Sequence, residues 1–304
     1  MVTPSSFEEL YPFQGRYLEL DGGRMHYLDE GSGDPVVMVH GNPTWSFHFR
    51  ELVRELRGAH RVIAPDHVGC GLSDKPPGGK YEYTLARRGH DLERLLDHLG
   101  IRRRITLVLH DWGGMIGLTY ATAHPDRIAR LVLLNTAGFP LPEGKRLPWE
   151  LRLARAPYLG AFLVRSLNLF ARGAARACVT RSSLPPAVRA AYLAPYDSFR
   201  NRIAVHRFVQ DIPLSPRDPA YEVVARVERG LDGLQGIPLL LLWGERDFVF
   251  DRTFLAEWLR RFPHAEVHRF PDSGHYVLED ARDEVLRIVS SFLRRHEIAE
   301  EVFR

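Results

Sequence analysis

One turn in the middle of the chain presents an acidic side chain where a nucleophile could act. Residues 107–115 include an apolar run that leads to Asp111, with Gly113 and Gly114 after it. This order predicts a strand, a sharp turn and a helix, and such a turn can raise a nucleophile above the carboxyl edge of a sheet. Leu109 stands where the usual G-x-S-x-G pattern has its first glycine. An ordinary turn in which Asp111 caps the helix would leave the same pattern.

A second apolar run, residues 35–39, ends in a turn that could supply hydrogen-bond donors. The main-chain N–H groups of Asn42 and Trp112 are placed to form an oxyanion hole. Their side chains carry neutral N–H donors, which suit a leaving halide or a developing oxyanion in a dry pocket. His40 is expected to pack beneath this turn. Asp66 follows another strand and is expected to stabilise the turn in which it lies.

Two further side chains would complete a catalytic triad. Asp247 and His275 each follow an apolar run, and catalytic groups gather at the carboxyl ends of strands in parallel sheets. The order Asp111, Asp247, His275 is that of nucleophile, acid and base in one hydrolase architecture. Other carboxylates that could orient the histidine are Glu245, Asp251 and Asp272. Asp247 is preferred because Asp272 is too near His275 in the chain and Glu245 lies nearer the strand end.

An aspartate nucleophile implies a particular reaction. A carboxylate displaces a leaving group from carbon and becomes the acyl part of an alkyl ester. Hydrolysis of that ester needs water to attack the carbonyl of Asp111, with His275 removing the proton from the water. Asp247 would hold His275 and stabilise its charge. A serine-type esterase is disfavoured because Asp111 fills the nucleophile position.

The pattern of apolar runs predicts the scaffold for these residues. Short runs rich in valine, isoleucine and leucine alternate with helical segments, which is typical of a mainly parallel sheet with helices on both faces. Residues 17–28 look like an opening hairpin. We therefore expect the α/β-hydrolase fold, an α/β architecture with a sheet of about eight strands.

About a hundred residues, from Asn135 to Ile237, contain no convincing strand and read largely as helix. Loops of that length without structure are uncommon in compact domains, so the interval predicts a helical cap over the sheet. The expected domains are a core of residues 1–138 and 220–304 and a cap of residues 139–219. The aromatic side chains expected to line a substrate pocket under the cap are Trp149, Phe162, Phe170, Phe199 and Phe208.

Composition excludes several classes of protein. The 304 residues are 45% hydrophobic and 26% charged, as in ordinary globular proteins. The 41 basic and 38 acidic side chains give a net charge of +3 and occur along the whole chain, unlike those of a nucleic-acid binder. Cys70 and Cys178 cannot hold a metal alone, and neither a metal nor a cofactor is expected. Residues 1–10 lack the apolar segment of a signal peptide, and no run is long enough to span a membrane. A cytoplasmic location is expected.

At this point the motifs resemble a known family. His40-Gly41-Asn42-Pro43-Thr44-Trp45, His110-Asp111-Trp112-Gly113-Gly114 and Gly274-His275-Tyr276 are similar to segments of the haloalkane dehalogenases. The resemblance covers nearly the whole chain. It implies Asp111 as the nucleophile, His275 as the general base and Asp247 as the catalytic acid. It also implies that Asn42 and Trp112 stabilise a halide.

Other segments resemble one branch of this family. Residues 144–149, 207–213 and 262–268 are similar to the β-lactone decarboxylases of bacterial olefin biosynthesis. The first expectation is a dehalogenase, which converts a haloalkane and water to a primary alcohol and halide through an alkyl-enzyme ester. The alternative, which the motifs fit equally, is a cis-β-lactone decarboxylase that releases a long-chain cis-alkene and carbon dioxide. A noncatalytic binding protein is the third hypothesis. The expected ligand is a small apolar molecule, with halide as a second ligand, and oligomers are compatible with the sequence.

Overall fold

A computed structural model describes residues 7–298. Eight strands form one sheet in the order β1-β2-β4-β3-β5-β6-β7-β8. The strands are β1 (Arg16–Leu20), β2 (Gly23–Glu30), β3 (Pro35–Val39), β4 (Arg61–Pro65), β5 (Ile105–Asp111), β6 (Ile128–Thr136), β7 (Leu239–Gly244) and β8 (Glu266–Phe270). β2 pairs antiparallel with both β1 and β4, and the remaining pairs are parallel. The predicted fold, with a mostly parallel sheet of about eight strands, is confirmed.

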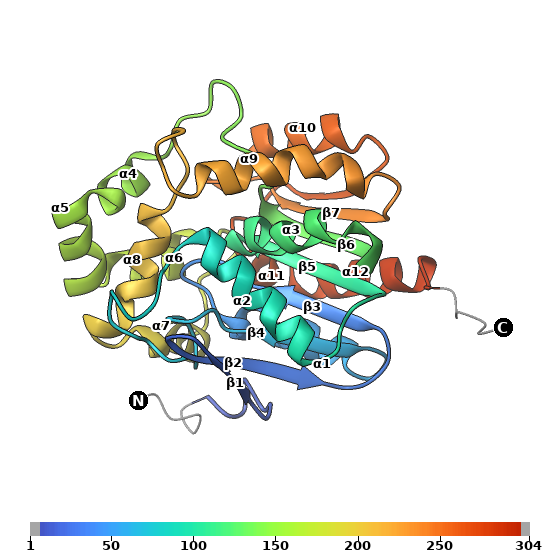
Figure 1. Ribbon diagram of the computed structural model, residues 1–304, viewed down its shortest axis with the longest axis horizontal. Helices are drawn as coiled ribbons and strands as arrows, with labels where there is room; N and C mark the ends of the chain where they lie inside the picture. Colours follow the sequence, from blue (N-terminus) through green and yellow to red (C-terminus); the bar gives the residue numbers. More distant parts are fainter. Residues whose placement is uncertain (1–6, 299–304) are drawn as a thin grey trace.

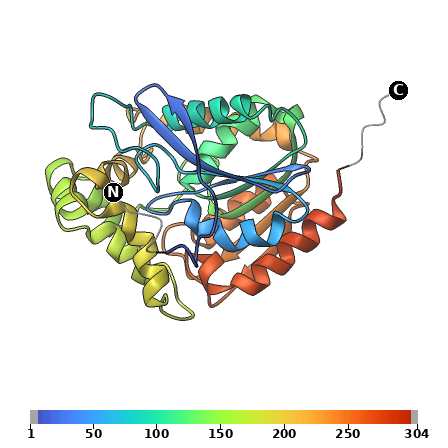
Figure 2. The same cartoon turned by 90° about the horizontal axis from the view of Figure 1, so that it is seen from below.

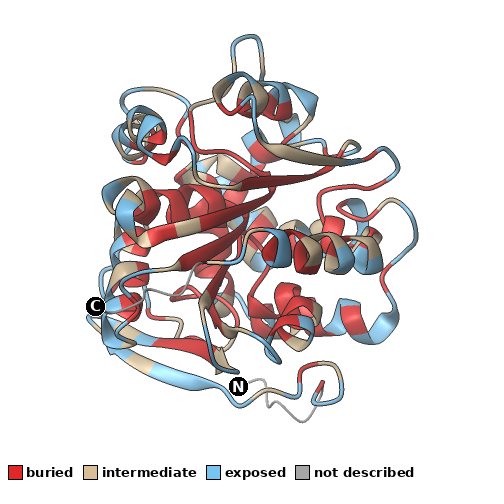
Figure 3. Cartoon of the chain, turned by 90° about the vertical axis from the view of Figure 1, so that its right-hand side faces the viewer, coloured by how far each residue is buried: buried red, intermediate tan, exposed pale blue. Residues whose placement is uncertain are grey.

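Apolar side chains on both faces of the central strands explain why helices cover the sheet on two sides (Figure 1). In β3, Val37 and Val39 belong to one apolar cluster, and Val36 and Met38 to the other, as the alternation of side chains along a strand requires. Figure 3 shows the sheet as the buried centre of the molecule. The buried strands therefore read as continuous apolar runs in the sequence.

The core helices divide between the two faces. Figure 2 shows α2 and α3, teal and green, on one side of the sheet, and α1 and α12, blue and red, on the other. The core helices and short helical turns are α1 (Arg50–Leu56), α2 (Leu85–His98), α3 (Trp112–Ala123), α9 (Tyr221–Gly230), α10 (Arg252–Arg261), α11 (Val277–Asp280), α12 (Arg282–Arg295), η2 (Ser46–Phe49), η3 (Pro125–Arg127) and η7 (Leu231–Leu234). None of the described helices is both long and apolar enough to cross a membrane.

Residues 139–219, between β6 and β7, contain helices and no strand. These elements are α4 (Trp149–Arg155), α5 (Pro157–Ala161), η4 (Phe162–Ser166), α6 (Leu169–Ala177), α7 (Pro186–Leu193), η5 (Ala194–Tyr196), η6 (Arg200–Arg202) and α8 (Ile203–Gln210). They gather at one end of the molecule (Figures 1 and 2). We call residues 139–219 the cap segment, and their separation from the core as a domain remains a prediction.

The start of α3 lies unusually close to the strands. A Cβ atom at Gly113 would lie 1.9 Å from the carbonyl oxygen of Val39, and one at Gly114 would lie 1.8 Å from the hydroxyl oxygen of Thr136. No side chain fits at such distances, so the two glycines let the helix begin directly above β3 and β6. This packing fixes the direction in which α3 leaves the end of β5.

Gly113→Ala should therefore destabilise the protein. The added methyl group has to displace main-chain atoms of β3, and overpacking of this kind costs about 1–3 kcal/mol in the free energy of unfolding. Urea denaturation would measure the loss. Gly173→Ala is the matched control, because a Cβ at Gly173 in α6 meets nothing within 4 Å and alanine favours a helix. Equal effects of the two substitutions would contradict the packing argument.

Candidate active site

Asp111 lies at the strained junction of β5 and α3. Its backbone has φ +54° and ψ −127°, in a region that side chains other than glycine rarely adopt and that often marks a functional site. The hydroxyl of Thr136 donates to the main-chain carbonyl oxygen of Asp111 at 2.5 Å. A Cβ at Gly41 would lie 2.1 Å from Oδ1 of Asp111. The neighbouring turn must therefore carry glycine for the carboxylate to occupy this place.

Main-chain N–H groups hold the carboxylate of Asp111. The N–H of Asn42 donates to Oδ1 at 2.6 Å, and the main chain of Trp112 also hydrogen-bonds to the carboxylate. Burial alone would raise the pKa of Asp111, but His275 above all, with His110 and the main-chain hydrogen bond from Trp112, brings the pKa below its usual value. Asp111 is therefore ionised at neutral pH. The two N–H groups are those that the sequence places in an oxyanion hole.

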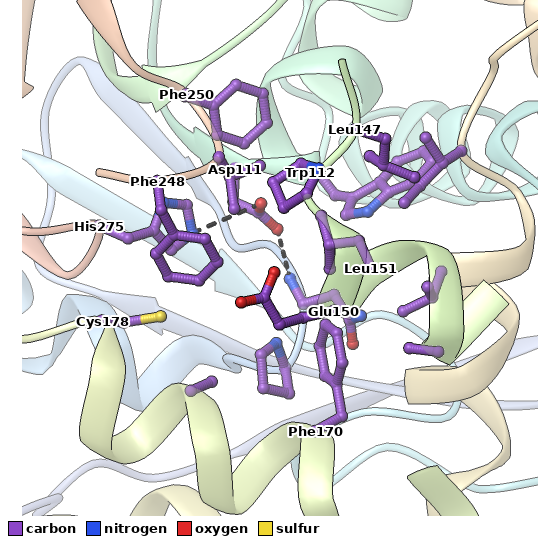
Figure 4. A pocket seen from close by; sticks show the side chains of 18 of the residues that line it. Asp111, Trp112, Leu147, Glu150, Leu151, Phe170, Cys178, Phe248, Phe250 and His275 are labelled. Atoms are coloured by element: carbon purple, nitrogen blue, oxygen red, sulfur yellow. Dashed lines mark hydrogen bonds and ion pairs between the residues drawn. The ribbon is translucent and has the colours of Figure 1, made fainter. Parts of the chain in front are cut away.

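His275 connects two carboxylates (Figure 4). Its Nδ1 lies 2.6 Å from Oδ2 of Asp247, and its Nε2 lies 3.5 Å from Oδ2 of Asp111. All three side chains are buried. Burial lowers the pKa of His275, but the charges and hydrogen bonds of Asp247 and Asp111 outweigh this and raise it to about 10. The imidazole is thus a cation at neutral pH.

The other carboxylates considered for this place are engaged elsewhere. Glu245 pairs with Arg269, Asp251 pairs with Lys145 and caps α10, and Asp272 pairs with Arg181. Asp66 accepts hydrogen bonds from the main-chain N–H groups of Ser46 and Leu72 and contacts His26, so it holds its turn. His40 is fully buried and accepts a hydrogen bond from the main-chain N–H of His67. None of these groups contacts His275 in the described part of the chain.

Asn135 is part of this arrangement and was not singled out by the sequence as a site residue. Its backbone has φ +34°. Its amide Nδ2 donates to Oδ2 of Asp247 at 3.0 Å, and its Oδ1 accepts from the N–H of Gly244 at 2.8 Å. The main-chain N–H of Val249 donates to the other oxygen of Asp247 at 2.7 Å. Asn135 therefore orients Asp247, and its place at the end of the strand before the cap segment is the signal that could have shown this.

A cavity of about 600 Å³ opens above the triad, within the range of about 300–1,000 Å³ usual for small-molecule sites. Asp111, His275, Asn42 and Trp112 line it on the core side. Lining residues from the cap segment and from the loop after β7 include Leu147, Glu150, Leu151, Phe170, Cys178, Phe248 and Phe250 (Figure 4). The lining is mostly apolar.

The five aromatic residues expected in the pocket divide into two groups. Trp149 and Phe170 line the cavity. Phe208 is fully buried and packs against Trp112, with ring centroids 5.4 Å apart, and against the guanidinium of Arg88. Phe162 and Phe199 are half exposed and do not line the cavity. Apolar residues on both sides of the cap helices make these alternatives hard to separate by sequence.

The side-chain donors of the site differ in their partners. Nδ2 of Asn42 donates to the main-chain carbonyl of Val205 in α8 at 3.2 Å, which fixes the amide against the cap segment. The indole of Trp112 borders the cavity.

Within residues 7–298 no group of three or more histidine, cysteine or acidic side chains is arranged to hold a metal ion.

Comparisons with known proteins agree with this description. The family model described as the alpha/beta hydrolase fold matches residues 34–281. The chain is 50% identical to a cis-3-alkyl-4-alkyloxetan-2-one decarboxylase of Shewanella oneidensis, over 95% of this chain and 91% of that protein. It is 47% identical to the enzyme of that name from Xanthomonas campestris, over 94% and 98%. Haloalkane dehalogenase 2 of Mycobacterium tuberculosis is 32% identical, over 94% and 96%.

A solved structure extends the similarity to three dimensions. The crystal structure of the haloalkane dehalogenase DatA from Agrobacterium tumefaciens superposes with a TM-score of 0.82 at 27% identity, over 93% of this chain and 97% of that one. The resemblance inferred from the motifs is thereby confirmed for the fold and for both groups of relatives. The chain belongs to the alpha/beta hydrolase fold family, in the branch that contains these decarboxylases and the haloalkane dehalogenases.

Proposed function

We propose that the protein is a cis-β-lactone decarboxylase in which Asp111 is the nucleophile and residues 139–219 form a cap that encloses the substrate. The observation that carries the choice of substrate is the identity of 50% and 47% to two oxetan-2-one decarboxylases, against 32% to a haloalkane dehalogenase, each over at least nine-tenths of the chain. The apolar cavity above Asp111 supports it, because a lactone with two alkyl chains needs a roomy pocket with few polar groups.

In the first step Asp111 opens the lactone. Its Oδ1 is held by the N–H of Asn42, so Oδ2 is the oxygen that attacks the alkyl-bearing ring carbon next to the ring oxygen, not the carbonyl carbon. A bond forms from Oδ2 to that carbon with inversion, and the bond from carbon to ring oxygen breaks. The ring oxygen keeps the electron pair and becomes part of a carboxylate on the neighbouring carbon. The product is an alkyl ester of Asp111, and Trp112, which lines the cavity, would donate its indole N–H to the new carboxylate.

In the second step the ester eliminates. The bond from carbon to the carboxylate breaks, its electron pair forms the double bond, and the bond from carbon to Oδ2 breaks. Carbon dioxide and the alkene leave, and Asp111 regains its charge. Inversion followed by anti elimination gives a cis-alkene from a cis-lactone. The His275 cation, close to Oδ2, stabilises the returning carboxylate, and the step needs no water.

Haloalkane hydrolysis is the second candidate function. It is favoured by the Trp112 indole beside Asp111 in an apolar pocket, since a neutral N–H donor there can stabilise a departing halide. Here water must attack the ester, and His275 must be neutral to accept the proton. Esterification removes the charge of Asp111, one of the influences that raise the pKa of His275. The imidazole would then be closer to its neutral form when hydrolysis requires a base.

A direct comparison of substrates tests the proposal. Purified protein is incubated in parallel with a long-chain cis-3,4-dialkyl-β-lactone and with 1-bromoalkanes, and alkene and bromide are measured. We expect kcat/KM to be at least about a hundredfold higher for the lactone, or about 2.7 kcal/mol in activation free energy. A hundredfold preference for the bromoalkane would instead assign the protein as a dehalogenase.

The two reactions should also differ in pH dependence. Lactone decarboxylation uses the His275 cation, which is present below its pKa of about 10. Its kcat/KM should be constant near neutral pH and fall only as the pH rises through about 10. Asp247→Asn removes a charge that raises the pKa of His275, so the fall should move to lower pH. Lactone activity that increases with pH above neutrality would contradict a role for the cation.

A further inference from the structure

The cap segment carries an unusual concentration of exposed apolar side chains. Eleven large apolar side chains are exposed in the described part of the chain, and seven of them lie between residues 149 and 169. We call these seven the cap patch; they are Trp149, Leu153, Tyr158, Leu159, Phe162, Leu167 and Leu169. Tyr158 is 92% exposed and Trp149 is 66% exposed. Single exposed apolar residues are common, but a contiguous set marks an interaction surface.

The cap patch lies at one end of the molecule and adjoins the cavity. Its residues come from α4, α5, η4, the turn after η4 and the start of α6, and these helices pack on one another in sequence. Figure 1 shows α4 and α5 at the end of the molecule opposite the C-terminus. Three residues of the patch, Trp149, Leu153 and Leu169, also line the cavity above Asp111. The exposed apolar surface is therefore continuous with the lining of the cavity.

The cap segment and the rest of the chain differ in the sign of their net charge. Residues 139–219 hold thirteen of the 41 basic side chains and five of the 38 acidic ones, which gives a net charge of +8 and leaves −5 for the remaining residues. Beside the cap patch, Arg152, Arg172 and Arg176 are exposed and form no ion pair with any residue in positions 7–298. Between residues 149 and 176 the only acidic residue is Glu150, against five arginines. A charge asymmetry of this size is typical of proteins that meet an anionic surface.

We propose that the cap patch docks on the surface of an anionic phospholipid bilayer. The arginines would lie among the headgroups, where each basic residue contributes about 1 kcal/mol, and Trp149, Tyr158 and Phe162 would enter the interface, which such side chains favour. The negative core would be repelled, so the charge distribution orients the cavity towards the lipid. A protein partner matches this surface less well, because the exposed charges beside the cap patch are nearly all positive. The proposal is independent of the reaction that Asp111 performs.

Vesicle binding of the full chain tests this proposal. Sucrose-loaded vesicles of phosphatidylcholine alone and of phosphatidylcholine with phosphatidylglycerol are sedimented with the protein, without substrate. We expect binding at least about tenfold stronger to the anionic vesicles, with a loss at high salt because ions screen exposed charges. Equal binding to both vesicles, or binding to neither, would overturn the proposal.

Matched variants locate the surface. Arg172→Gln with Arg176→Gln should weaken binding to anionic vesicles by about tenfold or more, whereas Arg94→Gln with Arg287→Gln, which removes two exposed charges from α2 and α12, should not. Tyr158→Ser with Phe162→Ser should also weaken it, and Tyr17→Ser, an exposed residue of β1, should not. If the cap variants bind like their controls, the patch does not face lipid. Loss of self-association in sedimentation velocity with unchanged vesicle binding would identify it as a contact between copies.

Discussion

Asp111→Asn is expected to abolish turnover of both β-lactones and haloalkanes. The amide is neutral and a poor nucleophile, while its shape and its carbonyl oxygen keep the hydrogen bond from the N–H of Asn42. Because the proposed reactions both pass through an ester of Asp111, we expect kcat to fall by about 10⁴-fold or more, the order of loss seen when a nucleophile is removed. Alkene, alcohol and bromide are measured after intact-mass analysis shows that the amide has not hydrolysed back to aspartate.

A matched control separates the chemistry from the loss of a negative charge. Asp272→Asn removes a carboxylate that is near His275 in the sequence but is half exposed and pairs with Arg181. This variant should keep kcat within about twofold of the parent, as surface substitutions usually cause little change. If Asp111→Asn retained full activity towards either substrate, Asp111 would not be the nucleophile for that substrate.

The architecture was predictable because the core strands are buried on both faces. Their continuous apolar runs, such as residues 239–242 of β7, separate clearly from the amphipathic helices between them. The turn at Asp111 was also visible, because Gly113 and Gly114 follow an apolar run directly and small residues there indicate a close approach of helix and strands. The local sequence thus indicated the strands and the turn at Asp111.

Other parts of the site depend on contacts between distant segments. Asn135 donates a hydrogen bond to Asp247, which lies more than a hundred residues later in the chain. An asparagine at the end of a strand is common and does not by itself indicate such a contact. The cap aromatics are a second case. Phe162 faces solvent, Phe170 lines the cavity, and Phe208 packs against the buried indole of Trp112. The packing of the cap helices determines these positions. An apolar helix face has the same pattern in each of these settings.

The contacts of His275 are compatible with either of the two proposed reactions. Asp247, held by Asn135 and Val249, keeps the imidazole oriented and raises its pKa most strongly, and Asp111 raises the pKa further. When Asp111 is ionised, the pKa of His275 is about 10 and the ring is a cation. When Asp111 is esterified, its contribution is absent and Asp247 alone opposes the effect of burial, so the ring is closer to neutral. Elimination returns the charge to Asp111 and so restores the first state, whereas hydrolysis requires a neutral ring.

His275→Ala should therefore separate the two chemistries. With a 1-bromoalkane we expect one equivalent of bromide per protein, an alkyl adduct on Asp111 and steady-state alcohol formation reduced by about 10⁴-fold, since no base remains to activate water. With the β-lactone we expect turnover to continue at a rate lower by about 10²–10³-fold, because the cation that stabilises the returning carboxylate is lost but no proton transfer is required. Intact-mass analysis and alkene measurement record both results.

His268→Gln provides the matched histidine control. His268 lies in β8, is partly exposed and pairs with Glu266, so the substitution should leave both reactions unchanged. Two results for His275→Ala would count against the scheme. Undiminished alcohol formation would remove His275 from the hydrolytic step. A stable adduct with the lactone, without alkene, would show that the ester needs a base to break down, and the second step would then have to be hydrolysis, not elimination.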